Sequence, residues 1–92
     1  MELREIEIFL TLAEELHFGR TAERLHVSVS RVSQSIRKQE RAVGAPLFAR
    51  TSRKVELTAV GEVLRTGLRP AYEGIGTAVA AARPRRDAWP AR

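Results

Sequence analysis

The segment from residue 28 to residue 38 gathers hydroxyl, amide and guanidinium side chains, which are groups that proteins use to read duplex DNA. On a helix, its polar positions share the face opposite Val32 and Ile36. The amide of Gln34 can pair with adenine, and Arg31 can bind guanine or a phosphate. We therefore predict that this face enters the major groove; the alternative is a solvated polar face. The residues assigned to DNA are Ser28, Ser30, Arg31, Ser33, Gln34, Arg37 and Lys38.

A second basic group lies in a short turn between two extended segments, residues 47–51 and 55–58. Two apolar-rich segments on either side of a polar turn indicate a β-hairpin. The turn is predicted to lie against the DNA backbone, with Arg53 able to enter a narrowed minor groove. The alternative is a solvated turn that keeps the hairpin soluble. The residues assigned to DNA here are Arg50, Thr51, Ser52, Arg53 and Lys54.

Charge is distributed unevenly along the 92 residues, whose net charge is +5. Residues 20–54 hold nine Lys and Arg against two Glu, a net of +7, whereas residues 1–19 hold one Arg against five Glu, a net of −4. The basic segment favours an anionic partner such as DNA. Four basic residues are expected either to touch phosphate or to pair with a nearby Glu such as Glu23 or Glu40, namely Arg20, Arg24, Lys38 and Arg41.

Three helices are predicted to position the reading face. The first spans residues 3–16, because apolar residues recur there at spacings of three and four. The second runs from about Gly19, which is a tolerable cap, to Leu25, and residues 26–27 form the turn that follows. Ser28 is the expected N-cap of the third helix, which should end at Gly44. The side chains expected to face the core are Leu3, Ile6, Phe9, Leu10, Ala13, Leu16, Ala22, Leu25, Val32, Ile36 and Val43.

These elements predict a mainly α fold over residues 1–58, a winged helix-turn-helix with a three-helix core and a β-hairpin wing. A long linker helix is predicted over residues 59–82, beginning after a Thr58 cap. It contains four glycines and Pro70, which disfavour an isolated helix, and Pro70 marks either a kink or its true end. We expect it to pack on the first helix and to pair with a second copy. The predicted dimerisation stripe is Val60, Val63, Leu64, Leu68, Ala71, Ile75 and Val79.

Several classes of function find no support in the sequence. Without cysteine there are no disulfides or thiolate metal sites. The two histidines lack a metal-ligand spacing and the serines lack a matched base, so neither an enzyme nor a cofactor is predicted. The N-terminus does not resemble a signal peptide, and no apolar run reaches the ~20 residues of a membrane span. We expect a cytoplasmic protein with no membrane partner and a disordered basic tail over residues 83–92.

Three stretches resemble the N-terminal DNA-binding domain of LysR-type bacterial transcriptional regulators. They are Glu14-Glu-Leu-His-Phe-Gly-Arg-Thr-Ala-Glu-Arg-Leu-His-Val-Ser28, Pro46-Leu-Phe-Ala-Arg-Thr-Ser-Arg53 and Leu57-Thr-Ala-Val-Gly-Glu62. The resemblance extends from about residue 2 to residue 83. It implies a winged helix-turn-helix, a linker helix that pairs antiparallel across a dimer, and an interrupted palindromic operator near a promoter.

Two features depart from that family. Its members commonly carry Gln-Pro-Ala-Leu-Ser-Arg-Gln after the serine that opens the recognition helix, where this chain has Val29-Ser-Arg-Val-Ser-Gln-Ser35, and Gln39 stands where an apolar residue is usual. The family's effector-sensing domain has no counterpart in these residues. The chain is therefore either an excised domain or a stand-alone binder, and we expect no effector molecule to bind it. Higher assembly in a full-length form stays open.

The sequence thus predicts a homodimer that binds double-stranded DNA in a sequence-specific manner and reads two inverted half-sites. The main alternative is a winged-helix protein-interaction module that forms mixed dimers with a full-length relative and silences it. A third possibility is a nonspecific chromosome-coating protein, which would show no sequence preference.

Overall fold

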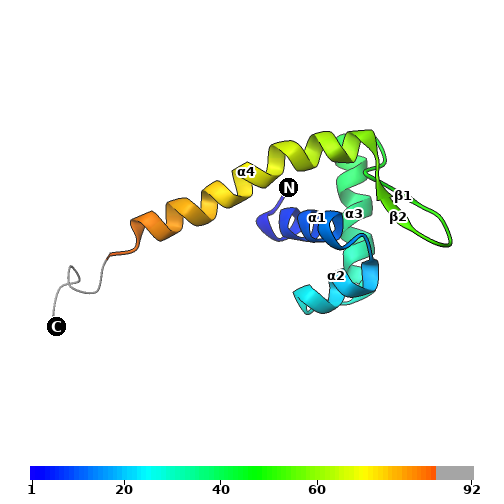
Figure 1. The fold of residues 1–92 in the computed structure, drawn as a ribbon, viewed down its shortest axis with the longest axis horizontal. Coiled ribbons are helices and arrows are strands. Elements are labelled where there is room, and N and C mark those ends of the chain that lie inside the picture. Colours follow the sequence, from blue (N-terminus) through cyan, green and yellow to red (C-terminus); the bar gives the residue numbers. More distant parts are fainter. Residues whose placement is uncertain (85–92) are drawn as a thin grey trace.

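The computed structural model describes residues 1–84 and contains four helices and one hairpin among them (Figure 1). The order is α1 (Leu3–Glu15), α2 (Phe18–Leu25), α3 (Val29–Val43), β1 (Phe48–Arg50), β2 (Val55–Leu57) and α4 (Ala59–Ala82). The predicted mainly α winged helix-turn-helix is confirmed. All but the first two residues of the predicted basic tail, 83–92, lie outside the described residues.

Local signals at the helix ends explain these bounds. A capping box between Glu2 and Glu5 begins α1, and the left-handed conformation of Leu16 (φ 51°) ends it. The hydroxyl of Ser28 accepts a hydrogen bond of 3.0 Å from the backbone N–H of Arg31, so Ser28 is the N-cap of α3 as predicted. Gly44, with φ 89°, ends α3 as predicted.

The predicted start of α2, with Gly19 as the cap, was two residues late, because the N-cap is His17. The helix begins at Phe18 because Nδ1 of His17 accepts a hydrogen bond of 2.9 Å from the backbone N–H of Arg20. Histidine is not among the common N-cap residues, so the residue type at position 17 did not indicate a cap. The turn between α2 and α3 is where it was predicted, with His26 in the left-handed conformation.

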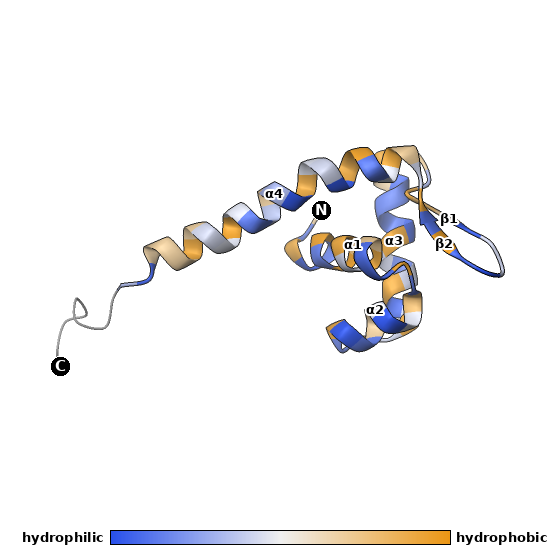
Figure 2. Cartoon of the chain, in the orientation of Figure 1, coloured by the Kyte–Doolittle hydropathy of each residue, from blue (hydrophilic) through white to orange (hydrophobic). Residues whose placement is uncertain are grey.

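The core lies where α1 crosses between α4 and the pair formed by α2 and α3 (Figures 1 and 2). Because α1 is covered on two sides, Ile8 and Leu12 are fully buried, although the predicted apolar face omitted them. The same prediction was wrong for Leu3 and Leu16, which lie at or beyond the ends of α1 and are 50% and 40% exposed. Val43, the last residue of α3, is also exposed rather than buried.

The wing is a two-stranded antiparallel sheet in which Phe48 pairs with Leu57 and Arg50 with Val55. Its base is fixed to α3, since a carboxylate oxygen of Glu40 accepts hydrogen bonds from the backbone N–H groups of Leu47 (2.8 Å) and Phe48 (3.3 Å). The ring of Phe48 also packs at 5.6 Å from that of Phe9 in α1. The wing therefore has a defined position beside the helix-turn-helix.

The fourth helix starts as predicted, with the hydroxyl of Thr58 accepting a 3.0 Å hydrogen bond from the backbone N–H of Gly61. Its first half packs on the core through half-buried Leu64, Leu68 and Tyr72. Its second half leaves the body and gives the described molecule a long axis of 58 Å (Figure 1). Pro70 lies inside the helix and does not end it. None of the helices within residues 1–84 is long and apolar enough to cross a membrane.

Candidate nucleic-acid interface

The exposed side of α3 carries the predicted reading face. Val32 and Ile36 are fully buried beneath it and fix its rotation toward solvent. The hydroxyl oxygen of Ser28 accepts the capping hydrogen bond, and its hydroxyl hydrogen and second lone pair stay available to DNA. The structure places the other assigned residues together along α3, with Ser33 half-buried and the rest exposed, namely Ser30, Arg31, Gln34, Arg37 and Lys38.

Lys38 differs from its neighbours because it has a partner in α1. Its ammonium lies 3.0 Å from a carboxylate oxygen of Glu5. The pKa of the Glu5 carboxyl is lowered, first by the hydrogen bond from the backbone N–H of Glu2 and then by Lys38. To bind a phosphate, the ammonium of Lys38 would have to break its contact with Glu5 or bind both anions at once.

The wing residues assigned to DNA fall into two groups. Thr51 holds the turn together, since its hydroxyl oxygen accepts hydrogen bonds from the backbone N–H groups of Arg53 (3.3 Å) and Lys54 (3.1 Å). The Lys54 ammonium lies 2.7 Å from a carboxylate oxygen of Glu56, and the contact raises the pKa of Lys54. Ser52 and Arg53 lie at the exposed tip, and among residues 1–84 Arg53 forms no ion pair.

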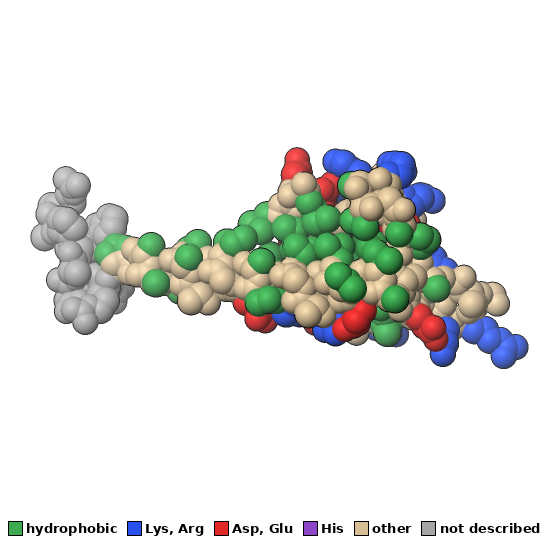
Figure 3. All heavy atoms as spheres, turned by 90° about the horizontal axis from the view of Figure 1, so that it is seen from above, with side chains coloured by type: hydrophobic (Ala, Val, Ile, Leu, Met, Phe, Trp, Pro, Cys, Tyr) green, Lys and Arg blue, Asp and Glu red, His purple; other side chains and the backbone are tan. Residues whose placement is uncertain are grey.

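Arg50 has an additional contact that the sequence did not indicate. Its guanidinium lies over the ring of Phe18, 4.5 Å from the ring centroid. Such a cation–π contact orients the guanidinium and joins the wing to the start of α2. In the space-filling view, Lys and Arg side chains (blue) project outward at the end of the molecule that lies opposite the free end of α4 (Figure 3).

The remaining arginines separate by position. Arg20 and Arg24 of α2 pair with carboxylates of α1, at 3.3 Å from Glu15 and 2.9 Å from Glu14. Pairing with glutamate was one of the two predicted roles, but the partners lie in α1 and are not the predicted Glu23 and Glu40. Arg41 is exposed on α3 and, within the described residues, forms no ion pair.

The predicted dimerisation stripe divides into two parts. Leu64 and Leu68 are half-buried against the core of their own chain, so for these two residues the structure shows intrachain packing. A second copy could meet them only at their exposed edges. The other residues of the stripe are exposed, and the side chain of Val63 is 75% exposed. These residues are Val60, Val63, Ala71, Ile75 and Val79.

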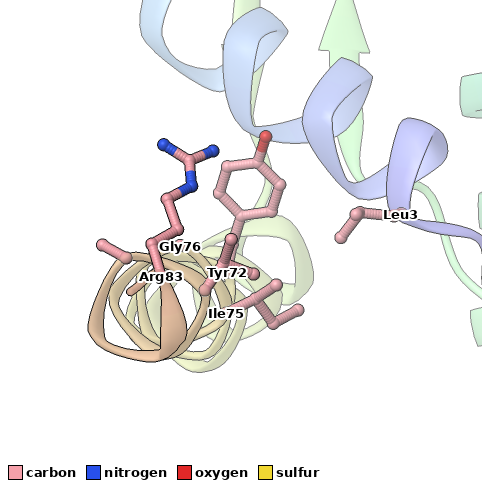
Figure 4. A pocket seen from close by; sticks show the side chains of 7 residues that line it. Leu3, Tyr72, Ile75, Gly76 and Arg83 are labelled. Atoms are coloured by element: carbon pink, nitrogen blue, oxygen red, sulfur yellow. The ribbon is translucent and has the colours of Figure 1, made fainter. Parts of the chain in front are cut away.

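The outer half of α4 and the start of α1 form an open apolar groove of about 320 Å³. In the close view, Tyr72 rises from α4 toward α1, and Leu3 of α1 lies across from Ile75 (Figure 4). Leu3 was predicted as a core residue, but the structure places it at the edge of this groove. No group of three His, Cys, Asp or Glu within residues 1–84 could hold a metal ion.

The structure is a winged helix-turn-helix, a class of fold found in DNA-binding proteins. The sequence matches one family of this class. Residues 3–62 match the profile of the bacterial regulatory helix-turn-helix proteins of the LysR family. The chain belongs to the LysR family.

Known relatives agree with this assignment. The HTH-type transcriptional regulator IlvR of Caulobacter vibrioides is 57% identical over 61 residues, which cover 66% of this chain and 21% of IlvR. The chain thus spans about a fifth of the length of this curated relative.

Two solved structures of DNA complexes are similar in fold. Full-length CbnR with its target DNA gives a TM-score of 0.82 at 31% identity, over 90% of this chain and 29% of CbnR. BenM_DBD with catB site 1 DNA gives a TM-score of 0.84 at 27% identity, over 88% of this chain and 91% of that one.

Proposed function

We propose that this chain is the sequence-specific DNA-reading part of a bacterial LysR-type transcriptional regulator. The observation that carries the proposal is the row of exposed polar and basic side chains on α3, held outward by the burial of Val32 and Ile36. In this arrangement α3 enters the major groove, and Gln34 and Arg31 contact base edges or phosphates. The similarity to CbnR and BenM_DBD, both solved with DNA, supports the same assignment.

The wing is proposed to contact the DNA backbone beside the major groove. Arg53 is the strongest candidate for the minor groove, because it lies at the tip and forms no ion pair within residues 1–84. Arg50 is held over Phe18 and is better placed to bind a phosphate than to enter a groove. Thr51, Ser52 and Lys54 stay in the proposed contact set as neighbours of Arg53.

Val29 is a further candidate that the sequence interpretation did not assign. It is the first residue of α3, it is 50% exposed, and it follows the Ser28 cap. Residues at the N-terminal end of a recognition helix contact base edges, and an apolar side chain there can contact the methyl group of thymine. Val29 lies seven residues before Ile36 and on the same side of the helix, so the sequence indicated a core position and not a base contact.

The chain is proposed to act as a homodimer through α4. Support comes from the exposed Ile75 and Val79 and the adjoining groove beside Leu3, which a second copy of α4 would cover. Two-fold symmetry would place two recognition helices in successive major grooves and require an interrupted palindrome. We propose a regulatory role without enzymatic activity, on nucleoid DNA in the bacterial cytoplasm, with no effector bound by this segment.

Selection from a random duplex-DNA pool, with the purified 92-residue chain at near-physiological salt, tests this proposal. We expect enrichment of two inverted half-sites at a fixed separation. A pool that binds without enriching any sequence would overturn specific recognition and favour a chromosome-coating role. If no DNA is retained at all, the chain would be a protein-interaction module of the kind that forms mixed dimers with a full-length relative.

A further inference from the structure

Two polar connections link the linker helix to the helix-turn-helix, and both pass through carboxylates of α1. In the first, Arg69 of α4 lies 2.8 Å from one oxygen of Glu14, whose other oxygen lies 2.9 Å from Arg24 of α2. One carboxylate therefore holds a side chain from each of the two flanking helices. Glu14 and Arg69 are 55 residues apart in the sequence, so this contact exists only through the tertiary fold.

The second connection runs parallel to the first. The hydroxyl of Tyr72 donates a hydrogen bond of 3.2 Å to Glu7, and the other oxygen of Glu7 pairs with Arg4. The guanidinium of Arg4 in turn donates a hydrogen bond of 2.7 Å to the backbone carbonyl of Leu25, the last residue of α2. A cation suits that position, because the carbonyl end of a helix carries partial negative charge.

The spacing of these residues makes the two connections act together. Glu7 and Glu14 are seven residues apart, so they lie on the same side of α1, two helical turns from each other. Arg69 and Tyr72 are three residues apart and lie on one side of α4. We call Glu7, Glu14, Arg69 and Tyr72 the junction clasp. All four line one polar pocket between α1, α2 and α4, and Arg69 and Tyr72 are half-buried in it.

The packing of α4 on the core ends at Tyr72. Leu64 and Leu68 anchor its first half on the core, and beyond Tyr72 every described residue of the helix is exposed. The clasp includes Tyr72, the last residue of α4 that is not exposed, and the helix beyond it extends away from the body (Figure 1). Beyond the clasp, residues 73–82 of α4 are about 15 Å long, so a tilt of about 12° at Tyr72 moves the end of the helix by about 3 Å, roughly the rise of one base pair.

We infer that the junction clasp sets the separation of half-sites that the protein accepts, with Arg69 and Tyr72 acting as positioning residues that touch no DNA. The inference rests on the proposed function, because it requires a dimer that reads paired half-sites. In such a dimer the two recognition helices are connected only through the two copies of α4. Motion of α4 relative to α1 would therefore vary the distance between the two recognition helices.

The test measures binding to duplexes whose two half-sites are separated by spacers that change one base pair at a time over one helical turn. Wild-type protein should show a sharp optimum. In Arg69→Gln and in Tyr72→Phe, the ratio of affinity at the optimum to affinity two base pairs away should fall roughly two- to fivefold, which is the equilibrium effect of one partly exposed polar contact. Arg69→Lys keeps the charge and should retain most of the preference.

Arg65→Gln is the matched control. Arg65 is half-buried on the same helix, but it pairs with Glu62 of α4 itself and not with α1. Its spacer profile should equal that of wild type. An unchanged profile in Arg69→Gln and Tyr72→Phe, or an equal change in Arg65→Gln, would overturn the inference and leave the proposed function intact. A wild-type protein with no preferred spacing would overturn both.

Discussion

The arginines of this chain are used in two different ways in two regions of the molecule. On α3 and at the wing tip, Arg31, Arg37, Arg41 and Arg53 are exposed, and none of them forms an ion pair within residues 1–84. The arginines at the junction of α1, α2 and α4 are engaged with glutamates of the chain itself, and these are Arg4, Arg20, Arg24 and Arg69.

The difference shows which basic residues are available to a polyanion. An arginine already paired with a carboxylate must lose that contact before it gains a phosphate, whereas an unpaired one must only shed water. Three of the five glutamates in residues 1–19, which are Glu7, Glu14 and Glu15, pair with arginines at this junction. The net charge of +7 in residues 20–54 overstates the charge that faces DNA, since Arg20 and Arg24 belong to the junction.

The largest effect is expected where the start of α4 packs closely on the residue that precedes β1. A Cβ added at Gly61 would lie 2.2 Å from the backbone carbonyl oxygen of Leu47, so α4 and the hairpin would have to separate. Gly61→Ala should lower the free energy of unfolding by about 1–3 kcal/mol or more, measured by urea denaturation.

Gly67→Ala is the matched control, because nothing lies within 4 Å of its added Cβ. It should gain up to about 1 kcal/mol from helix propensity. Equal effects of the two substitutions would show that α4 does not pack on the hairpin as described.

The second prediction concerns the reading face. Gln34 is exposed between Arg31 and Arg37, and its amide can form two hydrogen bonds with one adenine. Gln34→Ala should reduce discrimination at one base position in each half-site by about 1–3 kcal/mol, measured by binding to operator variants. Folding stability should stay within about 0.5 kcal/mol of wild type, because the side chain is on the surface. A uniform loss on all sequences would contradict the base contact.

Features fixed by neighbouring residues could be predicted from the sequence. The Ser28 cap, the end of α3 at Gly44 and the Thr58 cap each depend on contacts within a few residues, and all three are confirmed. The hairpin and the side of α3 that faces solvent follow from local alternation and helical periodicity in the same way.

Features that depend on distant parts of the chain could not be predicted. The burial of Ile8 and Leu12 follows from α4 covering a second side of α1, and the partner of Glu14 lies 55 residues away. Gln39 shows the same limit. It is buried where an apolar residue is usual, and its amide donates hydrogen bonds of 3.0 Å to the carbonyl of Glu5 and the hydroxyl of Ser35. Base contacts also stay predictions, because the partner that defines them is DNA.

The third prediction compares one arginine from each region. Arg53→Ala should weaken DNA binding and reduce the slope of log affinity against log salt by about 1 for each protomer, since a phosphate contact releases counterions. Arg24→Ala removes a side chain already paired with Glu14 and Glu15, so it should leave the slope unchanged. Titrations over a range of salt concentrations measure both. A lower slope in Arg24→Ala would show that junction arginines also reach phosphate.

The smallest effect is expected from protonation of the junction. Arg69 and then Arg24 lower the pKa of the Glu14 carboxyl from its ordinary value of 4.5. Because the folded-state pKa lies below the unfolded one, the stabilisation is present above about pH 4.5 and is lost as the pH falls through the folded-state pKa. Glu14→Gln should therefore lower the free energy of unfolding by less than about 1 kcal/mol at pH 7, a value limited by solvent screening, and should not change it at pH 2.

Urea denaturation at both pH values measures the difference, and the same substitution at exposed Glu73 is the control. A cost that persists unchanged at pH 2 would show that Glu14 contributes through packing, and the charge-based distinction between the two regions would then fail at this residue.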